Sequence, residues 1–272
     1  MRLRINYLLY FGLVIYLFSS CSSFEKIRKS SDVNYKLTKA NEYYDHKDYV
    51  HANELYKELM PIMKSTRNYE LLCYKYSYTF FYSKNYIEAS YHFKNFTESF
   101  PTSKYAEECE FMSAVCLYKY APKQTLDQAN TSKSLEALQS YVNRYPKSAR
   151  AEEANSYIDQ ARGKLEGKEA DAAKLYFNIG QFKAATVAYK SVMRDYPESA
   201  NIDLYQFMIM KSFYKYANIS IIEKQEERLV SAIAAYNELK DAHPDSKYLA
   251  EATALKLDSE KKINKIRNEQ HQ

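Results

Sequence analysis

The chain has 272 residues, with 39 Lys and Arg against 34 Asp and Glu, which gives a formal net charge of +5 at pH 7. This excess is too small to predict binding to nucleic-acid phosphates. Only four glycines occur, which argues against a turn-rich β fold and against glycine-rich phosphate-binding loops. There is no tryptophan, but there are 29 tyrosines, and the predicted fold has to account for them.

Residues 1–20 have the pattern of a bacterial signal peptide. Two arginines precede a mostly apolar run, residues 7–18, which is too short to span a membrane because a spanning helix needs about 20 apolar residues. Two serines and then Cys21 follow, in an order that resembles the lipobox of bacterial lipoproteins. Phe18 departs from that pattern, since leucine is usual three places before the cysteine. An ordinary cleaved signal with an incidental cysteine is the alternative.

We predict that Cys21 is lipidated and becomes the first mature residue. Each buried methylene of an acyl chain contributes about 0.8 kcal/mol, so several chains hold a folded domain to a bilayer. Ser22 follows the cysteine in place of aspartate, which by the lipoprotein sorting rule favours the outer membrane. Residues 21–31 are otherwise polar and predict a tether.

Four similar segments punctuate the rest of the chain: FPTSKYAEEC, YPKSARAEEA, YPESANIDLY and HPDSKYLAEA. In each, a proline ends one helix because it removes a backbone donor and clashes with the preceding turn. A serine two residues later can cap the next helix, and acidic residues follow where the helix dipole favours them. The prolines are Pro101, Pro146, Pro197 and Pro244, and the serines are Ser103, Ser148, Ser199 and Ser246.

Between these marks, small and aromatic residues recur in a frame of about 34 residues, the period of tetratricopeptide repeats. The small residues would let two antiparallel helices approach, and the aromatic residues would fill the gap beside them. These positions are Ala89, Ala185 and Ala232, followed by Phe93, Tyr189 and Tyr236. The sequence therefore predicts an all-α tetratricopeptide-repeat solenoid in which most tyrosines pack between helices.

We divide the predicted solenoid into five helix-turn-helix units and a C-terminal capping helix. The units are residues 32–64, 67–101, 102–146, 147–197 and 198–244, and the cap is residues 246–267. Residues 32–146 would hold repeats 1–3, and residues 147–268 would hold repeats 4–5 with the cap. Three units exceed the usual length. We expect their extra residues between helices at 121–133 and at 217–228, and in a long first helix over 148–178.

Three stretches resemble the BamD family, lipoproteins of the bacterial β-barrel assembly machinery. They are LDQANTSKSLEALQSYVNRYPKS, KLYFNIGQFKAATVAYKSVMRDYPES and the segment from Ser220 to Ala252. The resemblance implies a periplasmic scaffold that is lipid-anchored to the outer membrane and is not an enzyme. It implies that the C-terminal repeats bind the barrel-forming insertase through its periplasmic domain, and that the N-terminal repeats receive unfolded outer-membrane proteins. A tetratricopeptide adaptor lipoprotein for glycan uptake, or one linked to peptidoglycan, is the alternative.

A peptide-binding groove is predicted in the first two units. Tyr74, Tyr78 and Tyr82 are four residues apart and share one helical face. Beside amide side chains, such an aromatic wall suits an extended peptide that ends in an aromatic residue. The predicted groove residues are Asn34, Asn41, Tyr44, Tyr74, Tyr78, Phe81 and Tyr82. Packing of these tyrosines against neighbouring helices is the alternative interpretation.

The sequence predicts no catalytic residue, metal site or cofactor. The five histidines are scattered without the spacing of a metal-binding pair. The acidic residues are spread along helix faces and do not cluster with a base or nucleophile. The three cysteines beyond Cys21 have no close pairing, so we expect them to be buried as small apolar residues.

Overall fold

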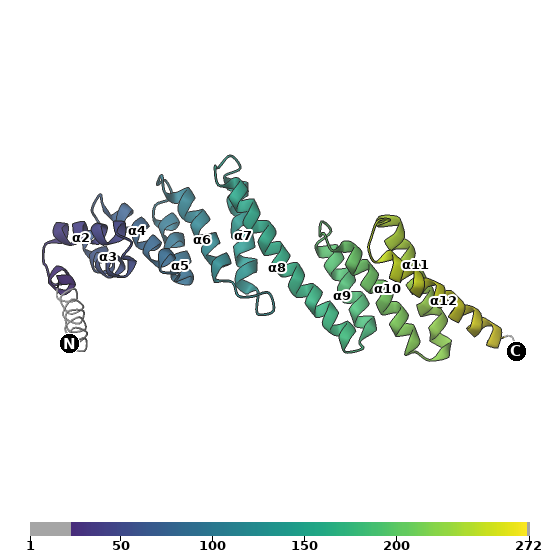
Figure 1. The fold of residues 1–272 in the computed structure, drawn as a ribbon. Coiled ribbons are helices and arrows are strands. Elements are labelled where there is room, and N and C mark those ends of the chain that lie inside the picture. Colours follow the sequence, from purple (N-terminus) through teal and green to yellow (C-terminus); the bar gives the residue numbers. More distant parts are fainter. Residues whose placement is uncertain (1–22, 271–272) are drawn as a thin grey trace, which may run out of the picture. The chain divides into compact units, whose positions relative to one another are not determined.

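A computed structural model describes residues 23–270, and all regular secondary structure in this range is helical (Figure 1). The predicted signal peptide and Cys21 lie outside the described residues. Consecutive helices form pairs, which are α2 (Val33–Asp45) with α3 (Tyr49–Met63), α4 (Tyr69–Tyr82) with α5 (Tyr86–Ser99), α6 (Ala106–Tyr120) with α7 (Ala129–Arg144), α8 (Ala151–Asn178) with α9 (Phe182–Asp195), and α10 (Ile202–Asn218) with α11 (Ile222–Ala242); α12 (Leu249–Gln270) follows. The predicted all-α tetratricopeptide architecture is confirmed. No described helix is long and apolar enough to cross a membrane.

The chain divides into two compact units. The first unit holds the described residues up to 122 together with 128–161, and the second holds 123–127 together with the residues from 162 onward. The division therefore falls inside α8, whereas the sequence placed the change between repeats at residue 146.

Within the second unit, the short segment 123–127 packs closely on α8. The side-chain amide of Gln124 donates a hydrogen bond to Asp171 (2.8 Å), and Lys168 Nζ donates to the carbonyl oxygen of Thr125 (2.7 Å). A Cβ at Gly167 would lie 2.6 Å from Gln124 Oε1, so a larger residue there would require the Gln124 side chain to shift. The loop and the second half of α8 are thus joined by two hydrogen bonds.

Each serine that follows a repeat proline ties its repeat to the preceding one. Our prediction that these serines cap the α-helices directly is wrong, because the helices begin three residues later. Each hydroxyl instead accepts a hydrogen bond from the N–H two residues on and donates one to an acidic side chain of the preceding repeat. The pairs, here called serine clasps, are Ser103 with Glu70 (2.6 Å), Ser148 with Glu107 (2.5 Å), Ser199 with Glu166 (2.5 Å) and Ser246 with Asp203 (2.8 Å).

The spacing within the serine clasps locates the extra residues of the third and fifth repeats. Acid and serine are 33 residues apart in the second and fourth repeats, but 41 and 43 apart in the third and fifth. In the third repeat the extra residues form a loop over 121–128, shorter than the predicted 121–133 because α7 begins at Ala129. In the fifth repeat the predicted loop over 217–228 is wrong, because α11 begins at Ile222 and the extra residues lengthen that helix.

The long first helix predicted for the fourth repeat is confirmed by α8. Because Glu166 and Ser199 keep the usual spacing of 33 residues, the extra residues lie before Glu166, in the first half of α8. That half packs within the first unit, where Ala154 is fully buried and Tyr157 contacts Phe111. The first half of α8 thus covers the end of the first unit, and the second half serves as the first helix of the fourth repeat.

The small and aromatic repeat positions lie in the cores, as predicted. Ala89, Ala185 and Ala232 are fully buried, and the aromatic residues that follow them are at most 8% exposed. Large flat side chains therefore fill the space beside the closest helix contacts. The described cysteines, Cys73, Cys109 and Cys116, are free and buried in the first unit.

The predicted polar tether over residues 21–31 is wrong for residues 23–28, which form a helical turn. Phe24 and Ile27 are only 7% and 6% exposed and belong to the core formed by α2, α3 and α4. Their three-residue spacing puts both side chains on one face of the turn. This part of the chain is therefore docked onto the first helix pair.

Candidate peptide-binding surface

Six tyrosines of the first unit form a continuous series of ring contacts, here called the tyrosine row. Its centre is on α4, where the four-residue spacing of Tyr74, Tyr78 and Tyr82 places them on successive turns of one face. Neighbouring ring centres are 5.0 Å apart between Tyr74 and Tyr78 and 5.5 Å apart between Tyr78 and Tyr82. The row consists of Tyr44, Tyr49, Tyr82, Tyr78, Tyr74 and Tyr105.

The two ends of the tyrosine row come from other helices. Tyr82 stacks on Tyr49 of α3 with ring centres 4.6 Å apart, and Tyr44 of α2 lies 6.3 Å from Tyr82. At the other end, Tyr74 stacks on Tyr105 at 4.3 Å, just before α6 begins. Helices of three successive repeats therefore contribute to one aromatic surface.

Solvent reaches the tyrosine row unevenly. Tyr82 is 45% exposed, and Tyr44 and Tyr49 beside it are half-buried, so this end is open to a ligand. Tyr78 is only 7% exposed and packs edge-to-face on Phe93 at 4.9 Å. It therefore supports the row from beneath and offers little surface of its own.

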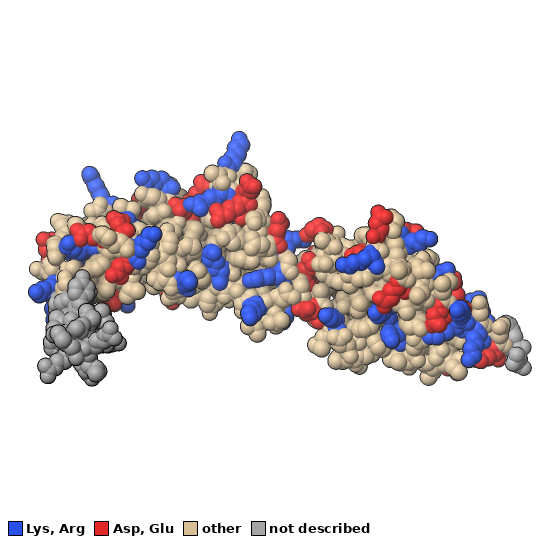
Figure 2. Space-filling model, in the orientation of Figure 1, with Lys and Arg blue, Asp and Glu red and all other residues tan. Residues whose placement is uncertain are grey.

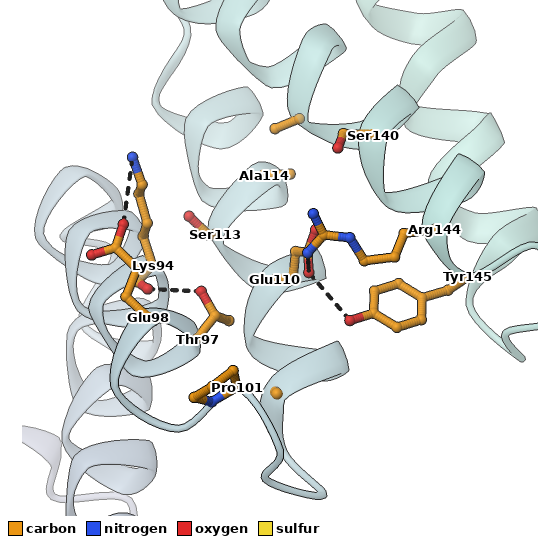
Figure 3. A pocket seen from close by; sticks show the side chains of 12 residues that line it. Lys94, Thr97, Glu98, Pro101, Glu110, Ser113, Ala114, Ser140, Arg144 and Tyr145 are labelled. Atoms are coloured by element: carbon orange, nitrogen blue, oxygen red, sulfur yellow. Dashed lines mark hydrogen bonds and ion pairs between the residues drawn. The ribbon is translucent and has the colours of Figure 1, made fainter.

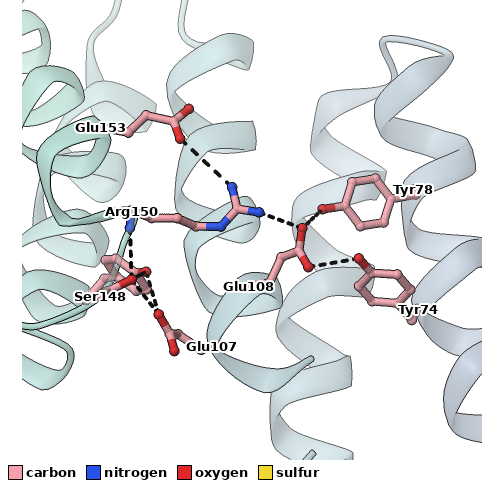
Figure 4. A network of polar contacts seen from close by, with 8 residues as sticks. Tyr74, Tyr78, Glu107, Glu108, Ser148, Arg150 and Glu153 are labelled. Carbon is pink, nitrogen blue, oxygen red and sulfur yellow. Dashed lines mark hydrogen bonds and ion pairs between the residues drawn. The ribbon is translucent and has the colours of Figure 1, made fainter. Parts of the chain in front are cut away.

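A polar network fixes the buried part of the row (Figure 4). Tyr74 and Tyr78 donate hydrogen bonds to the two carboxylate oxygens of Glu108, at 2.8 and 2.6 Å, and Arg150 donates to the same carboxylate at 2.8 Å. Burial, with the hydrogen bond to Glu108, raises the pKa of the Tyr78 hydroxyl, which stays protonated and donating. Arg150 also lies 3.9 Å from Glu153, so α4, α6 and α8 are joined by one chain of hydrogen bonds and ion pairs.

A cationic group lies beside the open end of the row. Lys75 Nζ donates to Asn41 Oδ1 at 3.0 Å and sits 4.9 Å from the ring centre of Tyr44. The same Asn41 oxygen accepts a hydrogen bond from Tyr56 at 2.8 Å. Asp45 is 3.6 Å from Lys75, but its side chain is 68% exposed, so this ion pair is weak and exchangeable.

The structure brings together most, but not all, of the predicted groove residues. Tyr44, Tyr74, Tyr78 and Tyr82 belong to the tyrosine row, Asn41 lies next to its open end, and Phe81 lies 6.1 Å from Tyr78 and 5.6 Å from Tyr82. Asn34 is exposed near the start of α2, away from the row, and its carbonyl oxygen accepts a hydrogen bond from the hydroxyl of Thr38 on the same helix at 2.9 Å.

Sequence reasoning missed several members of this surface: Tyr49, Lys75, Tyr105, Glu108 and Arg150. A weak signal existed for Tyr49, because KDYV at residues 47–50 matches KNYI at residues 84–87. In the sequence, Glu108 is only one of two adjacent acidic residues in the segment FPTSKYAEEC. Its role as acceptor for two tyrosines depends on the packing of α4 against α6, which no local pattern reveals.

A second depression lies between α5 and α7, with α6 as its floor (Figure 3). Its volume is about 420 Å³. Arg144 donates to Glu110 at 2.9 Å and Tyr145 donates to the same carboxylate at 3.3 Å, while Lys94 is paired with Glu98 at 3.9 Å. Since its charged groups are paired with one another, it is a weaker candidate than the tyrosine row.

Charge does not single out another site. On the face in Figure 2, positive and negative side chains are interspersed. Among residues 23–270, no group of three His, Cys, Asp or Glu side chains is arranged to hold a metal ion. Burial raises the pKa of Cys73 to about 11 and that of Cys116 to about 12, so both thiols stay protonated at neutral pH.

Paired helices that repeat along the chain define a helical-repeat protein of the tetratricopeptide type. The chain belongs to the YfiO outer membrane lipoprotein family, whose model matches residues 29–204. The chain is 26% identical over 160 residues to the outer membrane protein assembly factor BamD of Caulobacter vibrioides. The matched residues are 59% of this chain and 51% of that protein, so the chain spans about half the length of this curated relative. A solved TPR2AB-domain complex of yeast Sti1 is similar over 88% of this chain and 95% of that one, with 13% identity and a TM-score of 0.38, which supports no conclusion.

Proposed function

We propose that the chain is a scaffold subunit of the machinery that assembles outer-membrane β-barrel proteins. It would be held at the periplasmic face of the outer membrane by an acylated Cys21, dock the barrel-forming insertase and receive unfolded barrel proteins. The observation that carries this proposal is membership of the outer membrane lipoprotein family together with the relative that is named as an assembly factor.

The open end of the tyrosine row is the proposed receiving surface. Aromatic side chains of an extended peptide would stack on Tyr82, Tyr49 and Tyr44, which are accessible from solvent. Lys75 would pair with the terminal carboxylate of such a peptide in place of the exposed Asp45. The buried network around Glu108 keeps the wall in place without contacting the ligand.

An apolar patch in the second unit is the proposed docking surface for the insertase. Tyr176 and Val187 line a shallow pocket of about 490 Å³ between α8 and α9, and Lys183 lies at its edge. Leu175, next to Tyr176 in the sequence, and Ile179, just after α8, are 58% and 61% exposed, and Val187 is 63% exposed. Exposed apolar side chains in such a group are typical of protein–protein interfaces.

Purification of the native protein from solubilised outer membranes, followed by mass spectrometry, tests this function. We expect the insertase to dominate the co-purified proteins, and to be lost when Ile179 and Val187 are both changed to Glu. Val230→Glu is the matched control, because Val230 is also exposed (48%) but lies on α11. A sugar transporter in place of the insertase would support the adaptor alternative, and an unchanged yield with the double variant would exclude the α8–α9 patch.

A further inference from the structure

The helical turn of residues 23–28 packs against α2 and α3. The ring of Phe24 lies 4.2 Å from that of His51 on α3 and 5.8 Å from that of Tyr43 on α2. Both Phe24 and Ile27 are buried in the core of the first repeat. The helical turn of residues 23–28 is therefore part of the folded unit.

Polar contacts secure the other end of the same turn. The ammonium group of Lys36, a residue only 8% exposed, donates to the carbonyl oxygen of Arg28 at 2.7 Å and to Glu58 at 2.8 Å. The guanidinium of Arg28 lies 3.8 Å from the same Glu58. Apolar packing at one end and a buried lysine at the other leave this turn little freedom to move.

This docking limits how far the fold can be from the membrane. Phe24 follows Cys21 by three residues, which reach at most about 10 Å even when fully extended. Phe24 lies beside His51, near the start of α3 and the turn that joins α2 to α3. If Cys21 carries the proposed acyl chains, that turn is the part of the first unit nearest to the bilayer.

The turn between α4 and α5 is built in the same way and lies at the same end of the helix pairs. Asp48 N–H donates to the carbonyl of Tyr43 at 2.8 Å, and Asn85 N–H donates to that of Phe80 at 2.9 Å. The residues before them, Lys47 and Lys84, adopt positive φ angles of 64° and 60°. Tyr49, just after the first turn, stacks on Tyr82, just before the second, so the two turns lie side by side.

This edge combines basic and apolar side chains. Lys47 and Lys84 are exposed, and neither has an ion-pair partner among the described residues. Val50 and Ile87, each three residues further on, are 63% and 41% exposed. Lysine ammonium groups beside apolar side chains suit the headgroup region of a bilayer, where phosphates accept the charge and the acyl boundary takes the apolar groups.

We propose that the edge formed by Lys47, Val50, Lys84 and Ile87 rests on phospholipid headgroups of the anchoring membrane. The helical turn of residues 23–28, packed on the first helix pair, would fix this orientation relative to the membrane. The inference rests on the lipid anchor of the proposed function and adds to it the face of the protein that meets the membrane.

Depth measurements on the full-length lipoprotein in vesicles test the proposal. Vesicles of phosphatidylethanolamine and phosphatidylglycerol would carry a headgroup-bound quencher, and a fluorescent label would be attached at Ser83→Cys beside Lys84. Ser65→Cys, exposed at the opposite end of α3, is the matched control, since that helix is about 22 Å long. The described native cysteines are buried and react poorly.

We expect strong quenching at Ser83 and little at Ser65. Equal quenching at both positions would overturn the proposed edge. In a second arm, Phe24→Ser with Ile27→Ser should detach residues 23–28 from the first helix pair. Quenching at Ser83 should then fall to the Ser65 level while circular dichroism stays helical. Unchanged quenching in that variant would overturn the role of residues 23–28.

The contribution of the two lysine charges to the membrane contact is tested with Lys47→Gly and Lys84→Gly. Glycine is chosen because it suits a positive φ and preserves the turn. These changes should reduce quenching at Ser83 on vesicles with phosphatidylglycerol, and no reduction would exclude the lysines from the contact. Mass spectrometry of the same samples reports acylation of Cys21. An unacylated native protein would instead refute the anchor of the proposed function, which separates the two failures.

Discussion

Three turns that join paired helices are built alike, α2–α3 and α4–α5 in the first unit and α8–α9 in the second, but their left-handed position holds different residues. Lys47 and Lys84 occupy it in the first unit, with φ of 64° and 60°, and Gly180 occupies it in the second, with φ of 79°. The following N–H closes the same bond in each case, as Gln181 N–H does to Tyr176 at 2.9 Å. A side chain in this conformation costs roughly 1–2 kcal/mol, which glycine avoids.

The two units also differ in how many aromatic rings contact one another. Most ring contacts lie in the first unit, where tyrosine hydroxyls are bonded to Glu108 and rings reach the surface at Tyr82. The second unit has few ring contacts among its described residues, and its exposed aliphatic side chains include Ile179 and Val187. Under the proposed function, the rings with polar edges would receive an extended chain, and the apolar patch would dock a folded partner.

The largest expected effect is the loss of stability when a tyrosine in the buried part of the tyrosine row is removed. Tyr78→Ala should lower the free energy of unfolding by about 3 kcal/mol, because it leaves a cavity against Phe93 and removes a donor to Glu108. Urea unfolding followed by circular dichroism measures this change. Tyr82→Ala is the control, and with a side chain 45% exposed it should cost less than about 1 kcal/mol. Similar losses for both would mean that the row has no open end.

The next effect concerns peptide binding by the first unit. Tyr82→Ala with Lys75→Ala should weaken binding of a peptide from the C-terminus of a barrel protein roughly tenfold, since stacking and a charge contact are both lost. Fluorescence anisotropy with a labelled peptide gives the affinity. Tyr91→Ala removes a tyrosine that is 59% exposed on α5, away from the row, and should leave the affinity unchanged. Equal affinity of the double variant and the native protein would remove this site.

A smaller effect tests the turns directly. Lys84→Gly should raise the free energy of unfolding by about 1 kcal/mol, because glycine relieves the left-handed conformation. Gly180→Ala should lower it by a similar amount, even though no atom beyond the two neighbouring residues lies within 4 Å of the added Cβ. Thermal unfolding of the two variants checks both signs, and a loss of stability with Lys84→Gly would show that its side chain is needed for folding.

The smallest effect is a pH dependence in the second unit. Burial raises the pKa of Glu166, but hydrogen bonds from Ser199, Tyr205 and Asn201 lower it more, so the pKa lies below the usual 4.5. A carboxyl group with a lowered folded pKa contributes stability above its unfolded pKa, and this contribution is lost as the pH falls below about 4.5. Glu166→Gln should therefore flatten the acid side of the stability curve in urea titrations. An unaltered curve would show that the Ser199 clasp carries no charge-dependent stability.

The local sequence determined the helices and their pairing. Proline followed by serine marks every junction after the second repeat, because proline cannot continue a helix and serine closes the next turn. The alanines and aromatic residues at repeat positions predicted the closest helix contacts, and all of them are buried. These features depend on residues within a few turns of one another, so one sequence suffices to find them.

Only the tertiary structure decided which segments pack against distant parts of the same chain. Residues 222–228 extend α11, where Glu226 accepts a hydrogen bond from Arg267 at 2.8 Å and the neighbouring Leu229 packs with Ile263. Phe24 and Ile27 make a helical turn out of a segment that looked like a tether, because α2 and α3 offer them a core. Burial of Tyr78 likewise depends on contacts that Phe93 and Glu108 bring from other helices, and such long-range contacts leave no periodic mark in the sequence.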